Sequence, residues 1–133
     1  ANVRSARAEE GLVRLLLLDP GLAGAMGDMT GEEFSSPLLG RAFDRLRSRA
    51  EAGLYTQLGA LTEDFSGEEM DHLAQVALQP ESVAGSDRRI PEYISLIRSE
   101  KLLRGDGGQS PEELLMAAQK RFQQKKAYME GKK

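Results

Sequence analysis

The side chains able to perform acid–base or metal chemistry are few and widely spaced in this sequence. His72 is the only histidine, and the chain has no cysteine. Because a metal site gathers roughly three or four such donors, a lone histidine predicts none, and we assign His72 a structural or surface role. The carboxylate pairs Glu32-Glu33, Glu68-Glu69 and Glu112-Glu113 fall in first turns of predicted helices, where capping and the helix dipole explain them.

The glycine-rich segment at residues 105–108 is the one stretch that invites a phosphate-loop interpretation. It lacks the Gly-Lys-Ser/Thr ending that supplies such a loop with its lysine and metal-binding hydroxyl. No predicted strand precedes it, so we interpret it as a linker. No serine has an identifiable base beside it either, and the sequence predicts neither catalysis nor a bound cofactor.

Length and composition favour one domain from an intracellular protein. The chain has 133 residues, which suits a single domain with a small appendage. The absence of cysteine excludes a disulfide framework. The start, Ala1–Ser5, has neither an initiator Met nor the apolar core of a signal peptide, so we expect a fragment of a longer cytoplasmic protein.

Charge is distributed unevenly along the chain. Residues 1–85 contain 7 basic and 14 acidic side chains, whereas residues 86–133 contain 11 and 7. This asymmetry predicts two surfaces with different partners, although scattered solvated charge would give the same count. The basic end raises the possibility of a nucleic-acid-binding module, but its few aromatic residues and the net charge of −3 argue against direct binding.

The elements that must position any site are predicted to be helices throughout. The run Leu12–Leu18 is apolar on every side except at Arg14, so we expect it to form the central helix of a bundle. At seven residues it is too short to span a membrane. Asp19-Pro20 ends this helix, and Pro20–Met26 is predicted to be a short helix that Gly27 ends.

Local signals mark the other helix starts. A capping box is predicted at Thr30-Gly31-Glu32-Glu33 and another at Ser66-Gly67-Glu68-Glu69, while Ser36-Pro37 and Ser110-Pro111 combine a cap with proline. Gly53 is expected to end the helix from Pro37. Leu54, Leu58 and Leu61 are expected to line a short helix. The predicted buried positions of the longer helices are Leu39, Phe43, Leu46, Ala50; Met70, Leu73, Val76, Ala77; Ile90, Tyr93, Ile94, Ile97; and Leu114, Leu115, Ala118, Phe122. The positions assigned to solvent are Arg41, Asp44, Arg45, Arg47 and Arg49.

Three of these stretches together resemble a known family. Ala8–Pro20, Glu32–Ser35 and Pro37–Leu46 resemble the C-terminal helicase-binding domain of bacterial DNA primase. The N-terminal domain of the replicative helicase is similar in fold, but Ile94–Arg98 and the lysine-rich end after Ala118–Met129 look like a primase terminus. Gly40 departs from the bulkier residue that the family pattern leads us to expect.

The resemblance implies a non-catalytic domain of a primer-synthesising enzyme. It implies an all-α fold with a multi-helix bundle at residues 1–91 and a C-terminal helical hairpin at residues 92–133. The hairpin would bind the N-terminal ring of the replicative helicase, recruit primase to the replication fork and modulate both activities. No cofactor, metal or membrane enters this picture, and the fragment is expected to be monomeric.

Two other functions stay open on the sequence alone, namely the oligomerisation domain of the helicase itself and a single-stranded nucleic-acid-binding module. We expect two parts of the hairpin to make the contact. One is its second apolar face, Leu96 and Leu103, and the other is the group of apolar and basic residues near its C-terminal end. The predicted partner-binding residues are Leu96, Leu103, Phe122, Lys125, Lys126, Tyr128 and Met129.

Overall fold

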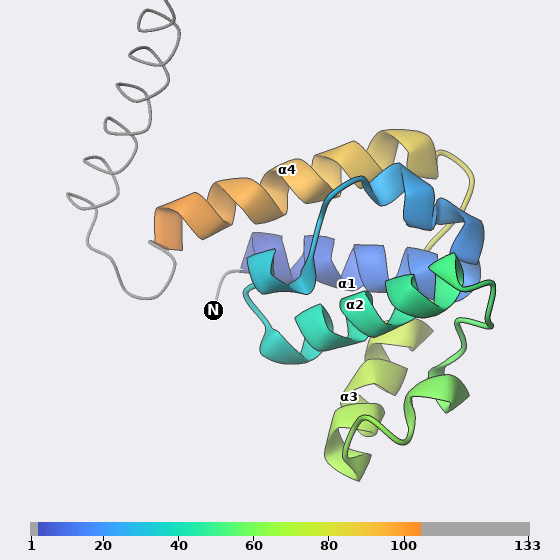
Figure 1. Ribbon diagram of the computed structural model, residues 1–133. Helices are drawn as coiled ribbons and strands as arrows, with labels where there is room; N and C mark the ends of the chain where they lie inside the picture. Colours follow the sequence, from blue (N-terminus) through green and yellow to red (C-terminus); the bar gives the residue numbers. More distant parts are fainter. Residues whose placement is uncertain (1–2, 105–133) are drawn as a thin grey trace, which may run out of the picture. The chain divides into compact units, whose positions relative to one another are not determined.

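The chain is helical throughout the part that the computed structural model describes, residues 3–104 (Figure 1). Its elements are α1 (Val3–Leu18), the 3₁₀ helices η1 (Pro20–Met26) and η2 (Gly31–Glu33), α2 (Pro37–Glu51), the 3₁₀ helix η3 (Leu58–Leu61), α3 (Gly67–Leu78) and α4 (Ser86–Arg104). No strand occurs among these residues. The predicted all-α bundle is therefore confirmed, while the second helix of the predicted hairpin lies outside the described residues.

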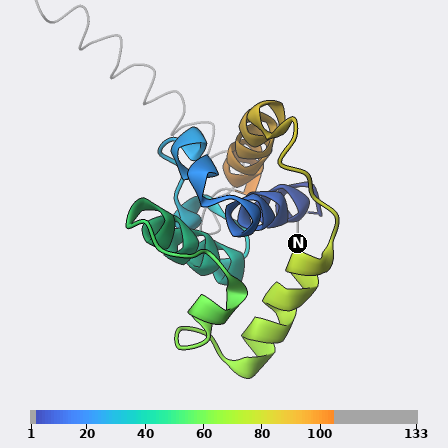
Figure 2. The same cartoon turned by 90° about the vertical axis from the view of Figure 1, so that its right-hand side faces the viewer.

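Helix α1 occupies the middle of the bundle, with α2, α3 and α4 on different sides of it (Figures 1 and 2). Leu12, Val13, Leu15 and Leu16 are completely buried, and each such side chain contributes roughly 1.5–3 kcal/mol through its removal from water. The predicted central helix is therefore confirmed. Leu18 is the exception, because the helix ends there and leaves this side chain 54% exposed.

The capping signals define the starts of α2 and α3 as predicted. The Ser36 hydroxyl accepts a hydrogen bond from the N–H of Leu39 at 3.2 Å. In the second box the Ser66 hydroxyl accepts from the N–H of Glu69 at 3.1 Å, and the Glu69 carboxylate accepts from the N–H of Ser66 at 2.9 Å. Each cap occupies backbone donors that a first turn leaves without a helical partner.

The apolar stripe of α2 faces the core as expected. Leu39, Phe43 and Leu46 are buried, and Ala50 is half-buried. Gly53 follows the end of the helix with φ +75°, a conformation that glycine adopts at little cost. Two backbone hydrogen bonds in this turn satisfy the last carbonyl groups of α2. The N–H of Leu54 donates to the carbonyl oxygen of Arg49 at 2.8 Å, and the N–H of Gly53 donates to that of Ala50 at 3.1 Å.

Two predicted core positions are wrong. Ala77 is exposed, because α3 turns its Leu73 and Val76 inward and ends one residue after Ala77. Leu54 is 49% exposed and precedes η3, whose Leu61 is fully buried. Both residues lie at the edge of an apolar stripe. The regular spacing of apolar residues continues to these positions in the sequence, but no neighbouring element covers them in the structure.

Arg47 was assigned to the solvent side of α2, and that assignment is also wrong. Its guanidinium donates to the carbonyl oxygen of Met29 at 2.9 Å and to that of Gly27. The side chain is 19% exposed. Arg47 therefore binds the connection between η1 and η2, a role that depends on a long-range contact.

Helix α4 covers the bundle with the predicted stripe. Ile90 and Ile97 are completely buried, while Tyr93 and Ile94 are half-buried against the core. The helix is continuous across residue 91, and the unit that contains the bundle extends to Arg98. Residues 92–98 thus belong to the bundle unit; the division into a bundle and a separable hairpin stays a prediction beyond them.

Candidate interaction site

The predicted partner-binding residues fall in different surroundings along the chain. Leu96 is half-buried against the core, whereas Leu103 is 75% exposed and follows the exposed Leu102. The other predicted contact residues, Phe122, Lys125, Lys126, Tyr128 and Met129, lie outside the described residues. The expected contact of the hairpin therefore stays a prediction, with Leu103 as its freely accessible described member.

A second group of exposed apolar side chains lies on the bundle, and the sequence reading did not identify it. It comprises Leu18, Leu54, Tyr55 and Leu78. The hydroxyl of Thr56 donates to the carbonyl oxygen of Leu16 at 2.7 Å, which fastens the segment after α2 beside the end of α1. Exposed large apolar side chains can mark a site of interaction where they adjoin a cleft, and Leu18 is the member of this group that lines one.

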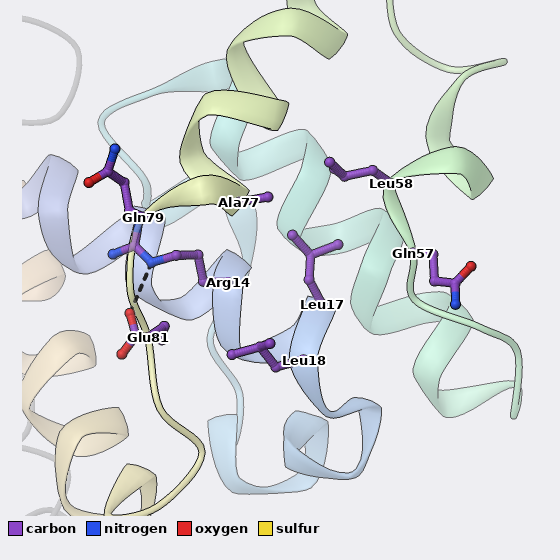
Figure 3. Close-up of a pocket in the computed structure, with 8 residues that line it drawn as sticks. All are labelled: Arg14, Leu17, Leu18, Gln57, Leu58, Ala77, Gln79 and Glu81. Carbon is purple, nitrogen blue, oxygen red and sulfur yellow. Dashed lines mark hydrogen bonds and ion pairs between the residues drawn. The ribbon is translucent and has the colours of Figure 1, made fainter.

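A cleft of about 310 Å³ lies between the ends of α1 and α3 and the start of η3 (Figure 3). The side chains of Leu17, Leu18, Leu58 and Ala77 surround its apolar part. The polar lining residues are Arg14, Gln57, Gln79 and Glu81. In Figure 3, Arg14, Gln79 and Glu81 lie together on one side of the cleft and Gln57 on the other.

Arg14 and Glu81 form a buried ion pair that holds one wall of the cleft. The Arg14 Nε lies 3.0 Å from the Glu81 Oε1, and the two side chains are 11% and 5% exposed. Arg14 also donates to the carbonyl oxygen of Val76 at 3.2 Å. The other Glu81 oxygen accepts from the Tyr93 hydroxyl at 3.2 Å and lies 3.4 Å from Arg89. Arg14 is thus accommodated in the central helix because its charge is paired.

This network connects α1, the loop after α3, and α4. Burial is the main reason that the pKa of the Tyr93 hydroxyl is raised, and the negative charge of Glu81 adds to it. The neutral Tyr93 hydroxyl thus donates a hydrogen bond to the Glu81 carboxylate. The ring of Tyr93 packs against Gly11, where an added Cβ would lie 2.7 Å from the ring Cζ.

The cleft is suited to an apolar group from another molecule. Its middle is uncharged, and the charges at its side are already paired with each other. Cores of protein interfaces are likewise poor in charge and rich in aromatic side chains. A volume of about 310 Å³ is at the lower end of the range for small-molecule pockets, about 300–1,000 Å³, so one or two apolar side chains of a partner would occupy it.

Groups for chemistry are not assembled here. Within residues 3–104 no cluster of three or more His, Asp or Glu side chains is placed to hold a metal ion. His72 is exposed and lines a shallow polar hollow that Arg7, Glu10 and Tyr93 also line. Glu69 serves the capping box of α3 as predicted.

Glu9 is a buried polar residue whose surroundings the sequence did not predict. Glu9 and Glu10 form a carboxylate pair on a helix face in the sequence, and in the structure Glu9 is completely buried. Its carboxylate accepts from the Ser5 hydroxyl (2.5 Å), from both the N–H and the hydroxyl of Ser35 (2.7 Å each) and from the N–H of Ser36 (3.1 Å). Four donors satisfy the buried charge, so Glu9 fixes the start of α2 against α1.

Comparison of the chain with protein-family models, curated proteins and solved structures finds no match. In the described part of the chain, none of the helices combines the length and the apolar character needed to cross a lipid bilayer.

Proposed function

We propose that this chain is a protein-binding domain of a bacterial DNA primase, which recruits the primase to the replicative hexameric helicase in the cytoplasm and modulates both activities. The domain itself performs no catalytic step in this proposal. The observation that carries it is the exposure of two large apolar side chains, Leu102 and Leu103, at the end of α4, in a helical chain whose sequence resembles that family.

The main contact is proposed to lie in residues 92–133. Support from the described part is limited to the end of α4, where Leu102 and Leu103 are 58% and 75% exposed. Apolar side chains at such positions serve as anchors in protein interfaces. The lysines at positions 125 and 126 would assist docking on an acidic surface of the helicase ring.

Calorimetric titration of the full chain against the N-terminal ring of a cognate helicase tests the proposal. We expect binding in the wild type and a loss of about tenfold or more for the double variant Tyr128→Ala, Met129→Ala, since truncated anchors typically cost 2 kcal/mol or more. The matched control is Tyr55→Ala, which removes an exposed aromatic ring from the bundle (78% exposed).

The two variants distinguish the possible outcomes. If Tyr55→Ala weakens binding and the double variant does not, the contact lies on the bundle and the assignment to residues 92–133 is wrong. If the wild type shows no heat of binding to any cognate ring, the proposed partner is wrong.

The uncharged cleft also favours one alternative, self-association as the N-terminal domain of the helicase. The two functions differ in oligomeric state. Light scattering at micromolar concentration should give the monomer mass for a primase domain, and a dimer or ring for a helicase domain. A dimer that Leu18→Asp dissociates would favour the helicase.

A further inference from the structure

The connection between η1 and α2, residues 27–34, is held between two arginines from different helices. We call it the strap; Figure 1 shows it running between α4 and α2. From α2, Arg47 donates to the carbonyl oxygens of Gly27 and Met29. From α4, Arg98 donates to both oxygens of Glu33, at 2.8 and 3.4 Å, and to Asp28 Oδ1 at 2.7 Å. Polar contacts thus hold the strap from both sides.

The strap covers apolar groups in the core. Met29 is 1% exposed and Phe34 6% exposed. The ring of Phe34 packs on that of Phe43, with centroids 5.1 Å apart. The strap itself has one 3₁₀ turn, at Gly31–Glu33. Its backbone is also held by the N–H of Gly31, which donates to Asp44 Oδ1 at 2.8 Å, and by the N–H of Met29, which donates to the carbonyl oxygen of Met26 at 3.2 Å.

The contacts of Arg98 are more exposed than those of Arg14. Arg98 is 42% exposed and Asp28 92% exposed, while Glu33 is 18% exposed. Ion pairs in such positions are screened by salt. Most exposed pairs contribute little, but this one combines a two-pronged arginine contact with a second carboxylate, the geometry in which a surface pair does contribute.

We infer that Arg98, with Glu33 and Asp28, forms an electrostatic latch whose release opens the strap locally and uncovers Met29 and Phe34. The rest of the bundle stays closed when the latch opens, because α1 and α2 are held by buried apolar contacts that salt does not weaken. Short segments that lack a regular helix and are held in part by exposed polar contacts can open below the global unfolding free energy. This property is independent of the partner proposed above.

Hydrogen exchange on the full chain, read by mass spectrometry, tests the latch. In the wild type, raising NaCl from about 0.05 M to about 0.5 M should accelerate exchange in the strap about fivefold or more, with the segment 12–16 of α1 unchanged. Arg98→Gln should show the fast exchange already at low salt and lose the response to salt. The rate at which hydrogen peroxide oxidises Met29 should rise in parallel, because the sulfur becomes accessible.

Arg45→Gln is the matched control. Arg45 makes one exposed ion pair from α2, to Asp64 at 2.9 Å, and does not contact the strap. It should leave strap exchange within about twofold of the wild type. Strap exchange that is equally slow in Arg98→Gln and the wild type would overturn the inference. So would acceleration spread equally over α1 and the strap, which indicates global destabilisation. Should the variant fail to fold, the salt response of the wild type alone decides between these outcomes.

Discussion

The backbones of Gly31 and Gly40 touch where η2 crosses the first turns of α2. A Cβ added to Gly31 would lie 2.5 Å from the carbonyl carbon of Gly40, and one added to Gly40 would lie 3.0 Å from the carbonyl carbon of Gly31. Each glycine therefore requires the other to lack a side chain. This contact explains why Gly40 departs from the bulkier residue expected from the family resemblance.

Gly40→Ala should destabilise the bundle by about 1–3 kcal/mol, because the new methyl group would collide with backbone atoms of Gly31, which cannot move aside as a flexible side chain can. Gly59→Ala is the control, since nothing lies within 4 Å of a Cβ there; it should stay within about 0.5 kcal/mol. Urea denaturation followed by circular dichroism measures both. Equal midpoints for the two variants would show that the strap yields to the methyl group.

The central helix provides a matched pair of leucines. Leu16 is completely buried and Leu18 is 54% exposed. Leu16→Ala should cost about 2–5 kcal/mol, through lost burial and an incompletely filled cavity. Leu18→Ala should cost less than about 1 kcal/mol, because much of that side chain is already in water. The same denaturation experiment would contradict this placement if Leu18→Ala were the more damaging change.

Two kinds of local signal, helix caps and apolar stretches, explain how much of the fold the sequence predicts. A cap such as Ser36 or Ser66 acts within three residues, so its helix start is predictable from local sequence alone. The burial of Leu12–Leu16 is predictable because an all-apolar helix has one stable environment. These signals predict that helices exist and where they begin, and the structure confirms both for α2 and α3; the start predicted at Ser110-Pro111 lies outside the described residues.

Residues whose role depends on a distant partner could not be placed in this way. Arg47 was predicted to face solvent and Glu9 to belong to a helix-face pair, yet besides a local partner each binds a residue 18 or more positions away, Met29 and Ser35 respectively. Nothing local pairs Gly31 with Gly40. The cleft was missed for the same reason, because it is formed where three elements end and no single stretch contains its pattern.

The ion pair beside the cleft gives a third prediction. Arg14→Met leaves the buried Glu81 with Arg89 as its remaining cation, at 3.4 Å, and should cost up to about 3–5 kcal/mol, since a buried charge that loses its closest partner is expensive. Arg7→Met is the control on the same helix; Arg7 is exposed and should tolerate the change within about 0.5 kcal/mol. Adding Glu81→Gln to Arg14→Met should recover part of the loss. Absence of any recovery would mean that packing of the arginine stem, rather than charge, accounts for the cost.

The latch carboxylate Asp28 makes stability depend on pH in the acidic range. The hydrogen bond from Arg98, followed by its charge, lowers the pKa of Asp28 below its ordinary value of 3.8. A carboxyl group with a lower pKa in the folded state stabilises the fold fully above its unfolded pKa, and loses this contribution as the pH falls through the folded pKa. The hydrogen bond from Arg41 lowers the pKa of Glu69 in the same direction, so the acid response of the wild type has at least two sources.

Asp28→Asn isolates the part that belongs to the latch. Its denaturation midpoint should lie below that of the wild type by a constant amount above about pH 5, and the difference should shrink toward zero as the pH approaches about 2. In the background of Arg98→Gln the same substitution should have a much smaller effect, since the largest causes of the lowered pKa are gone and only the backbone hydrogen bond of Asp28 and the charge of Arg47 still lower it. Denaturation curves for the four proteins, measured from about pH 2 to about pH 7, provide the test. A difference between wild type and Asp28→Asn that persists at the lowest pH, or that is undiminished in the Arg98→Gln background, would show that Asp28 stabilises the strap by something other than its bond to Arg98.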